Sequence, residues 1–176
     1  MNLPNVSLIV TLIAVVLQLN GCNSQTVRSA AVETPTVAPK PIPEHLLLDV
    51  GVKIFDPGIE YLDEEKSLTT PSVRKAEGGH TAQNVTQTLQ RTGNWGSVRI
   101  MPTEQSEADV NVTGQIVKSD GETLTVKVTV TDAANVQWYT RSYTDKLSQY
   151  AYDPTLRQKQ EPFQRLYNDI ANDMEQ

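Results

Sequence analysis

A long alternation of apolar and polar residues between positions 110 and 143 constrains the fold more than any other feature of this chain. Every second residue is apolar or glycine from 110 to 116 and again from 124 to 130, and Thr, Asn, Gln and Lys stand between them. An Asp120-Gly121 pair separates these runs, and a D-G pair flanked by alternating runs indicates a hairpin. A third run, 136–143, follows a short turn at 132–135. The sequence therefore predicts a three-stranded antiparallel meander over 108–145, with one apolar face and one Thr-rich face.

Two helices and two further strands are expected around this meander. Alternation over 45–56 predicts a strand that has Leu48, Val50, Val52 and Ile54 on one face and Phe55 on the other. A helix is expected over 72–91, most firmly over 80–90, with Ser72 able to cap it, and a strand over 95–102. The intervening residues 59–71 are acidic and irregular and predict a loop.

The last helix has the clearest helical period in the chain. Its apolar residues form one stripe, spaced i, i+3, i+4, i+7, i+8 and i+11: Phe163, Leu166, Tyr167, Ile170, Ala171 and Met174. Two strands that flank a helix can pair in parallel through a crossover, and the single apolar face of the meander needs a cover. The expected fold class is therefore α+β: a two-layer sandwich with a mixed sheet of about five strands covered by two helices.

The only cysteine follows a short apolar run near the beginning of the sequence. Residues 6–19 (VSLIVTLIAVVLQL) are almost all apolar, but this is shorter than the roughly 20 residues that a membrane-spanning helix needs and fits the core of a signal peptide. The next residues, Leu19-Asn20-Gly21-Cys22, resemble a bacterial lipobox. That resemblance implies that Cys22 carries a lipid and that residues 1–21 are removed as a lipoprotein signal peptide. The alternative is an ordinary signal peptide with an incidental cysteine.

Residues 22–43 are expected to be a tether between the lipid and a single periplasmic domain, residues 44–176. This segment is rich in Ser, Thr, Ala and Pro and has no periodicity, so it cannot bury enough apolar surface to fold. Fully extended, it would reach roughly 60 Å. Asn23, rather than Asp, follows the cysteine, which by resemblance to the bacterial sorting rule predicts an outer-membrane lipoprotein that faces the periplasm.

Charge and motif content exclude several functions. The formal net charge of −6 disfavours binding to nucleic acid. His45 and His80 have no partner at a metal-ligand spacing, so no metal site is predicted, and the run Asp63-Glu64-Glu65 is expected to be a solvated loop. No motif of nucleophilic catalysis occurs in the sequence. The sequence therefore predicts no catalytic residues, no cofactor and no enzyme.

Four stretches carry a resemblance to a group of bacterial envelope lipoproteins. They are VGVKIF at 50–55, LQRTGNWGSV at 89–98, ADVNVTG at 108–114, and VTDA at 130–133 followed by Trp138. They resemble the small periplasmic α+β domain of the curli-secretion lipoprotein, the penicillin-binding-protein activators, the auxiliary lipoproteins of lipid-transporting ABC systems and the amino-terminal domain of the Tol–Pal translocation protein. The resemblance covers about residues 46–145. It implies a tethered module that contacts and assists another envelope machine.

Aromatic residues are the candidates for a partner-binding surface, because Trp and Tyr dominate interface hot spots. They are Trp95, Tyr139, Tyr143, Tyr150 and Tyr152, and the alternative for each is core packing or a turn. The leading hypothesis is thus a non-enzymatic, membrane-anchored accessory lipoprotein that binds another cell-envelope component, of the assembly, cell-wall or transport machinery. The alternative is a periplasmic carrier or chaperone that binds a lipid or small ligand between sheet and helices, for which a deep apolar pocket would be decisive.

Overall fold

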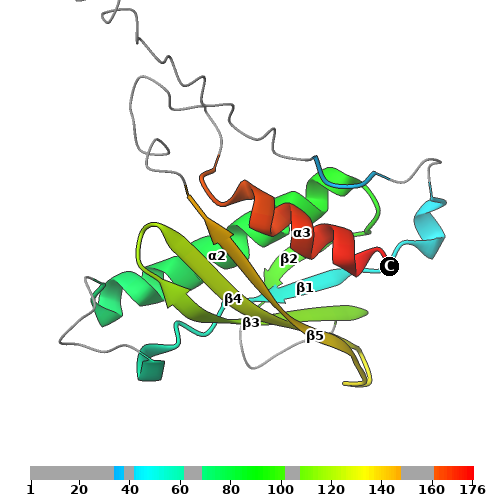
Figure 1. Cartoon of the computed structure of the whole chain (residues 1–176). Coiled ribbons are helices and arrows are strands. Elements are labelled where there is room, and N and C mark those ends of the chain that lie inside the picture. The colour runs from blue at the N-terminus through cyan, green and yellow to red at the C-terminus, as the bar shows by residue number, and fades with distance from the viewer. Residues whose placement is uncertain (1–33, 38–41, 62–68, 102–107, 148–160) are drawn as a thin grey trace, which may run out of the picture. The chain divides into compact units, whose positions relative to one another are not determined.

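A computed structural model describes residues 34–37, 42–61, 69–101, 108–147 and 161–176, all of which belong to one compact unit, Val32–Gln176 (Figure 1). Cys22, Tyr150, Tyr152 and the Asp63-Glu64-Glu65 run lie outside the described residues. The elements are, in order, η2 (Glu44–Leu46), β1 (Val50–Lys53), η3 (Ile59–Tyr61), α2 (Pro71–Thr92), β2 (Val98–Met101), β3 (Val110–Ser119), β4 (Thr123–Asp132), β5 (Gln137–Lys146) and α3 (Gln164–Met174).

The five strands form one mixed sheet in the order β2-β1-β3-β4-β5. β1 pairs in parallel with both β2 and β3, and β3, β4 and β5 form the predicted antiparallel meander. The helices α2 and α3 lie together on one face of this sheet, as Figure 1 shows. The α+β two-layer sandwich predicted from the sequence is confirmed, including the parallel crossover from β1 through α2 to β2.

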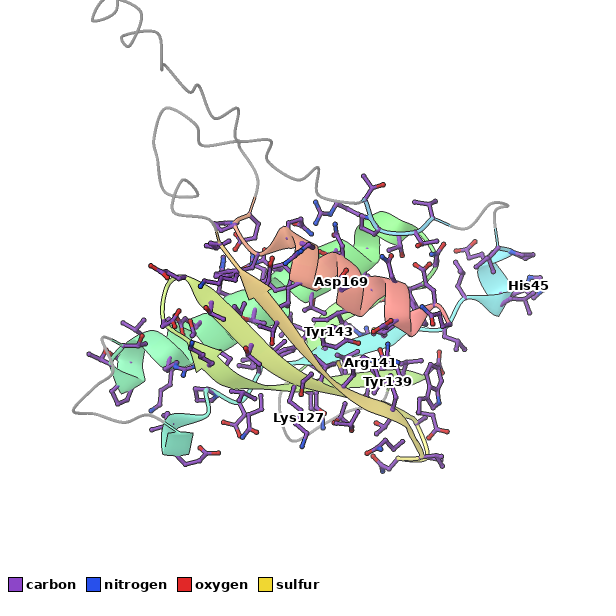
Figure 2. All side chains as sticks on the ribbon, in the orientation of Figure 1. His45, Lys127, Tyr139, Arg141, Tyr143 and Asp169 are labelled. Atoms are coloured by element: carbon purple, nitrogen blue, oxygen red, sulfur yellow. The ribbon has the colours of Figure 1, made fainter. Side chains whose placement is uncertain are left out.

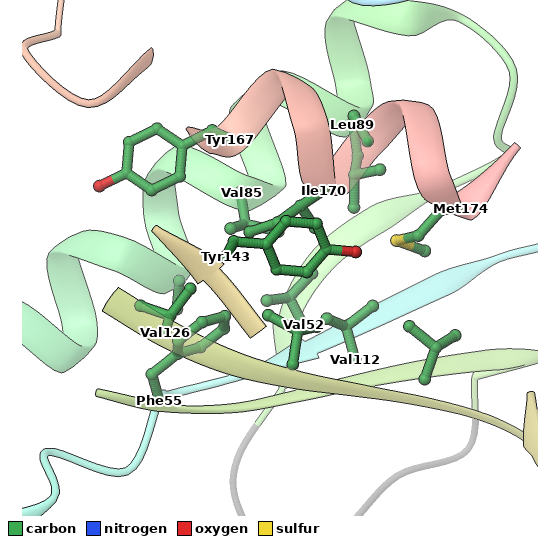
Figure 3. Close-up of a cluster of buried hydrophobic side chains, with 14 of the residues drawn as sticks. Val52, Phe55, Val85, Leu89, Val112, Val126, Tyr143, Tyr167, Ile170 and Met174 are labelled. Atoms are coloured by element: carbon green, nitrogen blue, oxygen red, sulfur yellow. The ribbon is translucent and has the colours of Figure 1, made fainter. Parts of the chain in front are cut away.

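The core fills the space between the two layers (Figure 3). Alternate residues of β1, β3 and β4 are completely buried, and α3 contributes the predicted stripe, since Leu166, Tyr167, Ile170 and Ala171 are at most 1% exposed. The opposite face of the meander is hydroxyl-rich: Thr129 pairs with Thr140 and Thr125 with Thr144 through their side-chain oxygens, at 2.7 and 3.0 Å. The alternation in the sequence therefore gives the meander one buried apolar face and one solvent-exposed, Thr-rich face, which we call the wet face.

The first strand is shorter than predicted, and its last residues are on the opposite sides from those expected. Ile54 is 51% exposed and Phe55 only 1% exposed. Pairing with β2 ends at Lys53, so the period of two no longer applies beyond it, and Phe55 packs on Gly114 of β3. A Cβ built on Gly114 would lie 2.2 Å from the Phe55 ring, which explains why this core position holds glycine.

The helix α2 begins earlier than the sequence suggested. The Thr70 side chain, rather than that of Ser72, accepts a hydrogen bond from the Val73 amide and caps the helix, and Pro71 occupies its first turn. Gly93, in the left-handed conformation at φ 68°, ends it. Gly78 lies in the middle of α2 because the Phe55 carbonyl oxygen approaches the helix there, 2.4 Å from where a Cβ would stand.

Candidate functional site

The predicted partner-binding aromatics that the structure describes do not form one exposed cluster. Tyr143 is 7% exposed, and Trp95 and Tyr139 are half-buried against the core. The indole N–H of Trp95 is buried and makes no hydrogen bond within the described part of the chain. Trp95 follows the end of α2, whereas Tyr139 and Tyr143 project from β5 toward α3, so packing accounts for most of their surface.

Two clusters of side chains bind α3 to the edge strand β5. Figure 2 shows Tyr139, Arg141 and Tyr143, the β5 members of the first cluster. The Tyr143 hydroxyl donates to Asp173 Oδ2 at 2.8 Å, and Arg141 Nη1 lies 2.5 Å from the same oxygen. About two turns toward the start of α3, Arg165 donates to Asp145 through Nε, at 3.1 Å, and through Nη2. Arg141 also lies over the Tyr139 ring, 5.7 Å from its centre.

The surroundings of Tyr143, Arg141 and Arg165 keep these three hydrogen-bond donors protonated. Burial, and after it the hydrogen bond to Asp173, raises the pKa of Tyr143 well above its usual value, so the phenol remains a donor. Hydrogen bonding to Asp173 likewise raises the pKa of Arg141, and Asp145 does the same for Arg165. Both clusters therefore fasten α3 to β5 through donors that keep their protons.

The same charges lie at the β5 edge of the sheet. Among the described residues, β5 is the last strand in the sheet order, and no described strand pairs with its outer side. Arg141 and Asp145 point toward the helix layer at this edge, and a bulge at Trp138 interrupts the pairing, since Val130 pairs with Tyr139 but Thr131 with Gln137. Inward-pointing charges and bulges are features by which proteins prevent edge-to-edge pairing, so β5 is poorly suited to receive another strand.

A groove of about 250 Å³ opens where α2, the start of α3 and the β3–β4 turn meet. Leu124, Phe163 and Tyr167 line its apolar side, and Glu77 and Glu161 its polar side. Burial and then the negative charge of Glu161 raise the pKa of Tyr167 to about 12.

The polar side of this groove is largely engaged with neighbouring side chains. Glu161 lies 3.4 Å from His80 Nε2, and Glu77 accepts from Ser119 at 2.9 Å and faces the buried Arg74 at 3.8 Å. Pockets for small molecules usually measure about 300–1,000 Å³. This groove is smaller, and its carboxylates oppose the entry of an acyl chain.

The carrier hypothesis required a deep apolar pocket between sheet and helices. Side chains of the core occupy that space in the described residues (Figure 3). Among the described residues, no three His, Cys, Asp or Glu side chains come together in a way that could hold a metal ion. None of the helices in the described ranges is long and apolar enough to cross a membrane.

One end of the domain gathers exposed apolar side chains that the sequence analysis did not single out. We call it the tether end, because the chain enters the domain there; it comprises residues 34–37, 42–49, 93–97, 108–109, 132–138 and 172–175. Its exposed large apolar residues are Val37, Ile42, Leu46, Leu48, Val136 and Trp138. The sequence signal that could have found Val136 and Trp138 is their position beside an uncharged hairpin turn.

Polar contacts order the tether end. Asp49 accepts from the Ser97 amide at 2.7 Å, and its own amide donates to Asp109 at 2.9 Å. The Thr36 amide donates to Asn172 Oδ1 at 2.8 Å, and the Thr36 carbonyl accepts from Asn94 at 3.1 Å. Part of the predicted tether is thus held on the ends of α2 and α3, and the chain between Cys22 and the first held residue is about 14 residues long, enough to span roughly 40 Å.

Comparison with known proteins adds two distant structural likenesses. No protein-family model and no curated protein matches the sequence. A PelC dodecamer from Paraburkholderia phytofirmans matches with a TM-score of 0.40 and 18% identity, over 80% of this chain and 86% of that chain. Protein XCC0632 from Xanthomonas campestris, of the DUF330 family, matches with a TM-score of 0.42 and 10% identity, over 80% of this chain and 89% of that one. At these TM-scores the likenesses carry no argument about function.

Proposed function

We propose that this protein is a non-enzymatic accessory lipoprotein of the bacterial cell envelope. Its lipid on Cys22 fixes it to the periplasmic face of the outer membrane, and its α+β domain binds and assists another envelope component. The observation that carries this proposal is the sequence Leu19-Asn20-Gly21-Cys22 directly behind a short apolar run. A thioether-linked lipid also gives a role to a single cysteine, which cannot form an internal disulfide.

The domain supports a binding role better than catalysis or transport of a lipid. The charged groups described above are engaged with one another and fasten α3 to β5. The sheet–helix interface is packed with side chains. What the domain offers a partner is surface: the wet face of the meander, the half-buried rings of Trp95 and Tyr139, and the tether end.

Intact-mass measurement of the mature protein tests the anchor. We expect a chain that begins at Cys22 and carries the added mass of two or three acyl chains. A Cys22→Ala variant is the matched control, and it should leave the membrane fraction. A mature chain that keeps its leader, or has a bare thiol at Cys22, contradicts the proposal.

Cross-linking in intact cells tests the accessory role. Photoreactive side chains placed at Lys127, on the wet face, and at Arg91, on the helix layer, sample both layers of the domain, and both positions are exposed. A specific envelope protein should be captured from one of them. The capture should disappear when Ile170→Asp disrupts the domain. No captured protein from either layer would count against the proposal.

A further inference from the structure

The turn between β4 and β5 is held by hydrogen bonds from Asp132 and carries exposed apolar side chains. The Asp132 carboxylate accepts from the amides of Ala134 and Val136, both at 2.8 Å, and the Asp132 amide donates to the Val136 carbonyl at 3.0 Å. The charge of Asp132 is thus used within the turn, and residues 133–138 are uncharged. Val136 is 59% exposed and Trp138 44% exposed. An ordered turn loses little conformational entropy when its side chains enter another phase.

This turn lies at the end of the sheet where the tether arrives. Asp132, at the end of β4, pairs with Val110, at the start of β3, and Val110 pairs in parallel with Val50, at the start of β1. Leu46, at 62% exposure, and Leu48, at 42%, immediately precede β1. In Figure 1 the β4–β5 turn and η2 both lie at the right-hand end of the domain.

We propose that the tether end rests on the lipid bilayer, with Val136 and Trp138 inserted into the interfacial layer. This inference rests on the proposed function, because it needs the lipid on Cys22. Trp side chains are enriched at membrane interfaces, where an amphipathic ring sits among the headgroups. We call the roughly 14 residues from Cys22 to Thr36 the leash. Their length restricts this end of the domain to within roughly 40 Å of the bilayer surface.

The leash allows a weak contact to hold the domain in place. An attached surface is presented to the bilayer at an effective concentration in the millimolar range, so the turn need not bind membranes strongly by itself. A bilayer is favoured over a protein partner as the occupant because it is the surface that the leash brings to this end of the domain.

The charges of the tether end determine which lipid headgroups it can contact. Glu44, Asp49 and Asp109 lie there, with His45 next to Glu44, and Arg99 is 3.9 Å from Asp49. Anionic headgroups would be repelled within a Debye length, so the surface suits zwitterionic lipid. We expect contact with vesicles of phosphatidylcholine and phosphatidylethanolamine, and a loss of contact at low salt when anionic phosphatidylglycerol is added.

Tryptophan quenching tests the contact in the mature, lipid-modified protein. A Trp95→Phe variant leaves Trp138 as the only tryptophan, and the protein is reconstituted into zwitterionic vesicles whose lipids are brominated near the headgroup. Insertion predicts that Trp138 emission falls by about half and moves to shorter wavelengths. In the matched Trp138→Phe variant the remaining Trp95, half-buried against the core, should be quenched less than Trp138 is.

A spin label gives a second measurement that leaves both tryptophans in place. Because acylation occupies the thiol of Cys22, Val136→Cys supplies a single reactive cysteine, and Lys127→Cys on the open face of β4 is the control. The label at 136 should become accessible to dissolved oxygen and protected from a water-soluble nickel complex, and the label at 127 should not.

The outcomes separate this inference from the proposed function. If mass measurement shows the acyl chains on Cys22 but position 136 stays in water and Trp138 is unquenched, the bilayer contact is refuted and the accessory lipoprotein stands. If Cys22 carries no lipid, both fail. A shift of Trp138 that occurs only after another envelope protein is added would assign the turn to a protein contact and overturn the inference.

Discussion

The two adjacent glycines in α2 give the sharpest test of how this fold is packed. Gly78 and Gly79 stand in the same helix turn, and from the sequence both only weaken the helix. In the structure they differ: a Cβ on Gly79 would meet nothing within 4 Å, whereas a Cβ on Gly78 would lie 2.4 Å from the Phe55 carbonyl oxygen. Replacing each glycine by alanine should therefore change the stability in opposite directions.

The expected magnitudes follow from this geometry. Gly79→Ala gains helix propensity and should stabilise the domain by about 1 kcal/mol. Gly78→Ala makes the same gain, but its methyl group must push a backbone carbonyl away by roughly 1 Å, and overpacking of this kind costs about 1–3 kcal/mol. That carbonyl belongs to Phe55, whose ring fills the space over Gly114 and whose amide donates to the Gly78 carbonyl at 3.4 Å. Set against the gain in helix propensity, the net effect of Gly78→Ala should be a loss of up to about 2 kcal/mol, with about 1 kcal/mol as the middle of the range.

Thermal and urea unfolding of the two variants, followed by circular dichroism, measure the difference. For a domain of this size about 1 kcal/mol corresponds to roughly 3–4 °C in Tm, so a difference of about 2 kcal/mol should separate the two variants by roughly 6–8 °C. If Gly78→Ala melts at or above the temperature of Gly79→Ala, the close approach of β1 to α2 is not as described and the packing argument fails.

Three further perturbations test other contacts. Ile170→Asp puts a carboxylate into a fully buried position of α3 and should unfold the domain, seen as loss of the cooperative melt; an unchanged melt would mean that α3 is not docked. Tyr143→Phe removes the hydroxyl that donates to Asp173 and should lower the free energy of unfolding by about 1 kcal/mol in urea titrations, with Tyr139→Phe as a control that should cost less. The Asp120 pKa is lowered from 3.8 to about 2, chiefly by its hydrogen bond to Lys118, so its contribution is present above about pH 4 and is lost as the pH falls toward 2. Since Asp120 is largely exposed, this contribution stays below about 1 kcal/mol, and acid titration of Asp120→Asn should lack it.

The regular elements could be predicted because their periodicity covers many residues. The meander alternates over about thirty positions, and the stripe of α3 repeats through three turns. Such long patterns determine the type of secondary structure with little influence from tertiary contacts. The Asp120-Gly121 turn and the Gly93 stop also follow from local backbone preferences, and both glycines have positive φ in the structure. Local chemistry was sufficient at these positions.

The missed details all depend on neighbours that are distant in sequence. Ile54 and Phe55 changed sides because pairing with β2 stops at Lys53, which the sequence of β1 does not show. Gly78 is explained only by the carbonyl of Phe55, and Thr70 was overlooked as a cap because Ser72 was an equally good candidate. The exposure of Val136 and Trp138 depends on how far the neighbouring elements cover the end of the sheet. Local sequence patterns predict strand ends and turns less well than regular elements. The tether end consists largely of such strand ends and turns.

The hydrogen bonds of Thr36 affect how far the domain could stand from the proposed lipid anchor at Cys22. Its two hydrogen bonds, to Asn172 and from Asn94, are exposed, and exposed bonds of this type contribute about 0.5–1.5 kcal/mol each. The contact is therefore weak compared with the packed core, and a pull on the tether would open it before it disturbed the sheet. Release as far as Pro43 would lengthen the leash from about 14 to about 21 residues, which adds roughly 20 Å of reach. If Cys22 is lipid-modified as proposed, these same contacts would limit how far the domain can stand from the membrane.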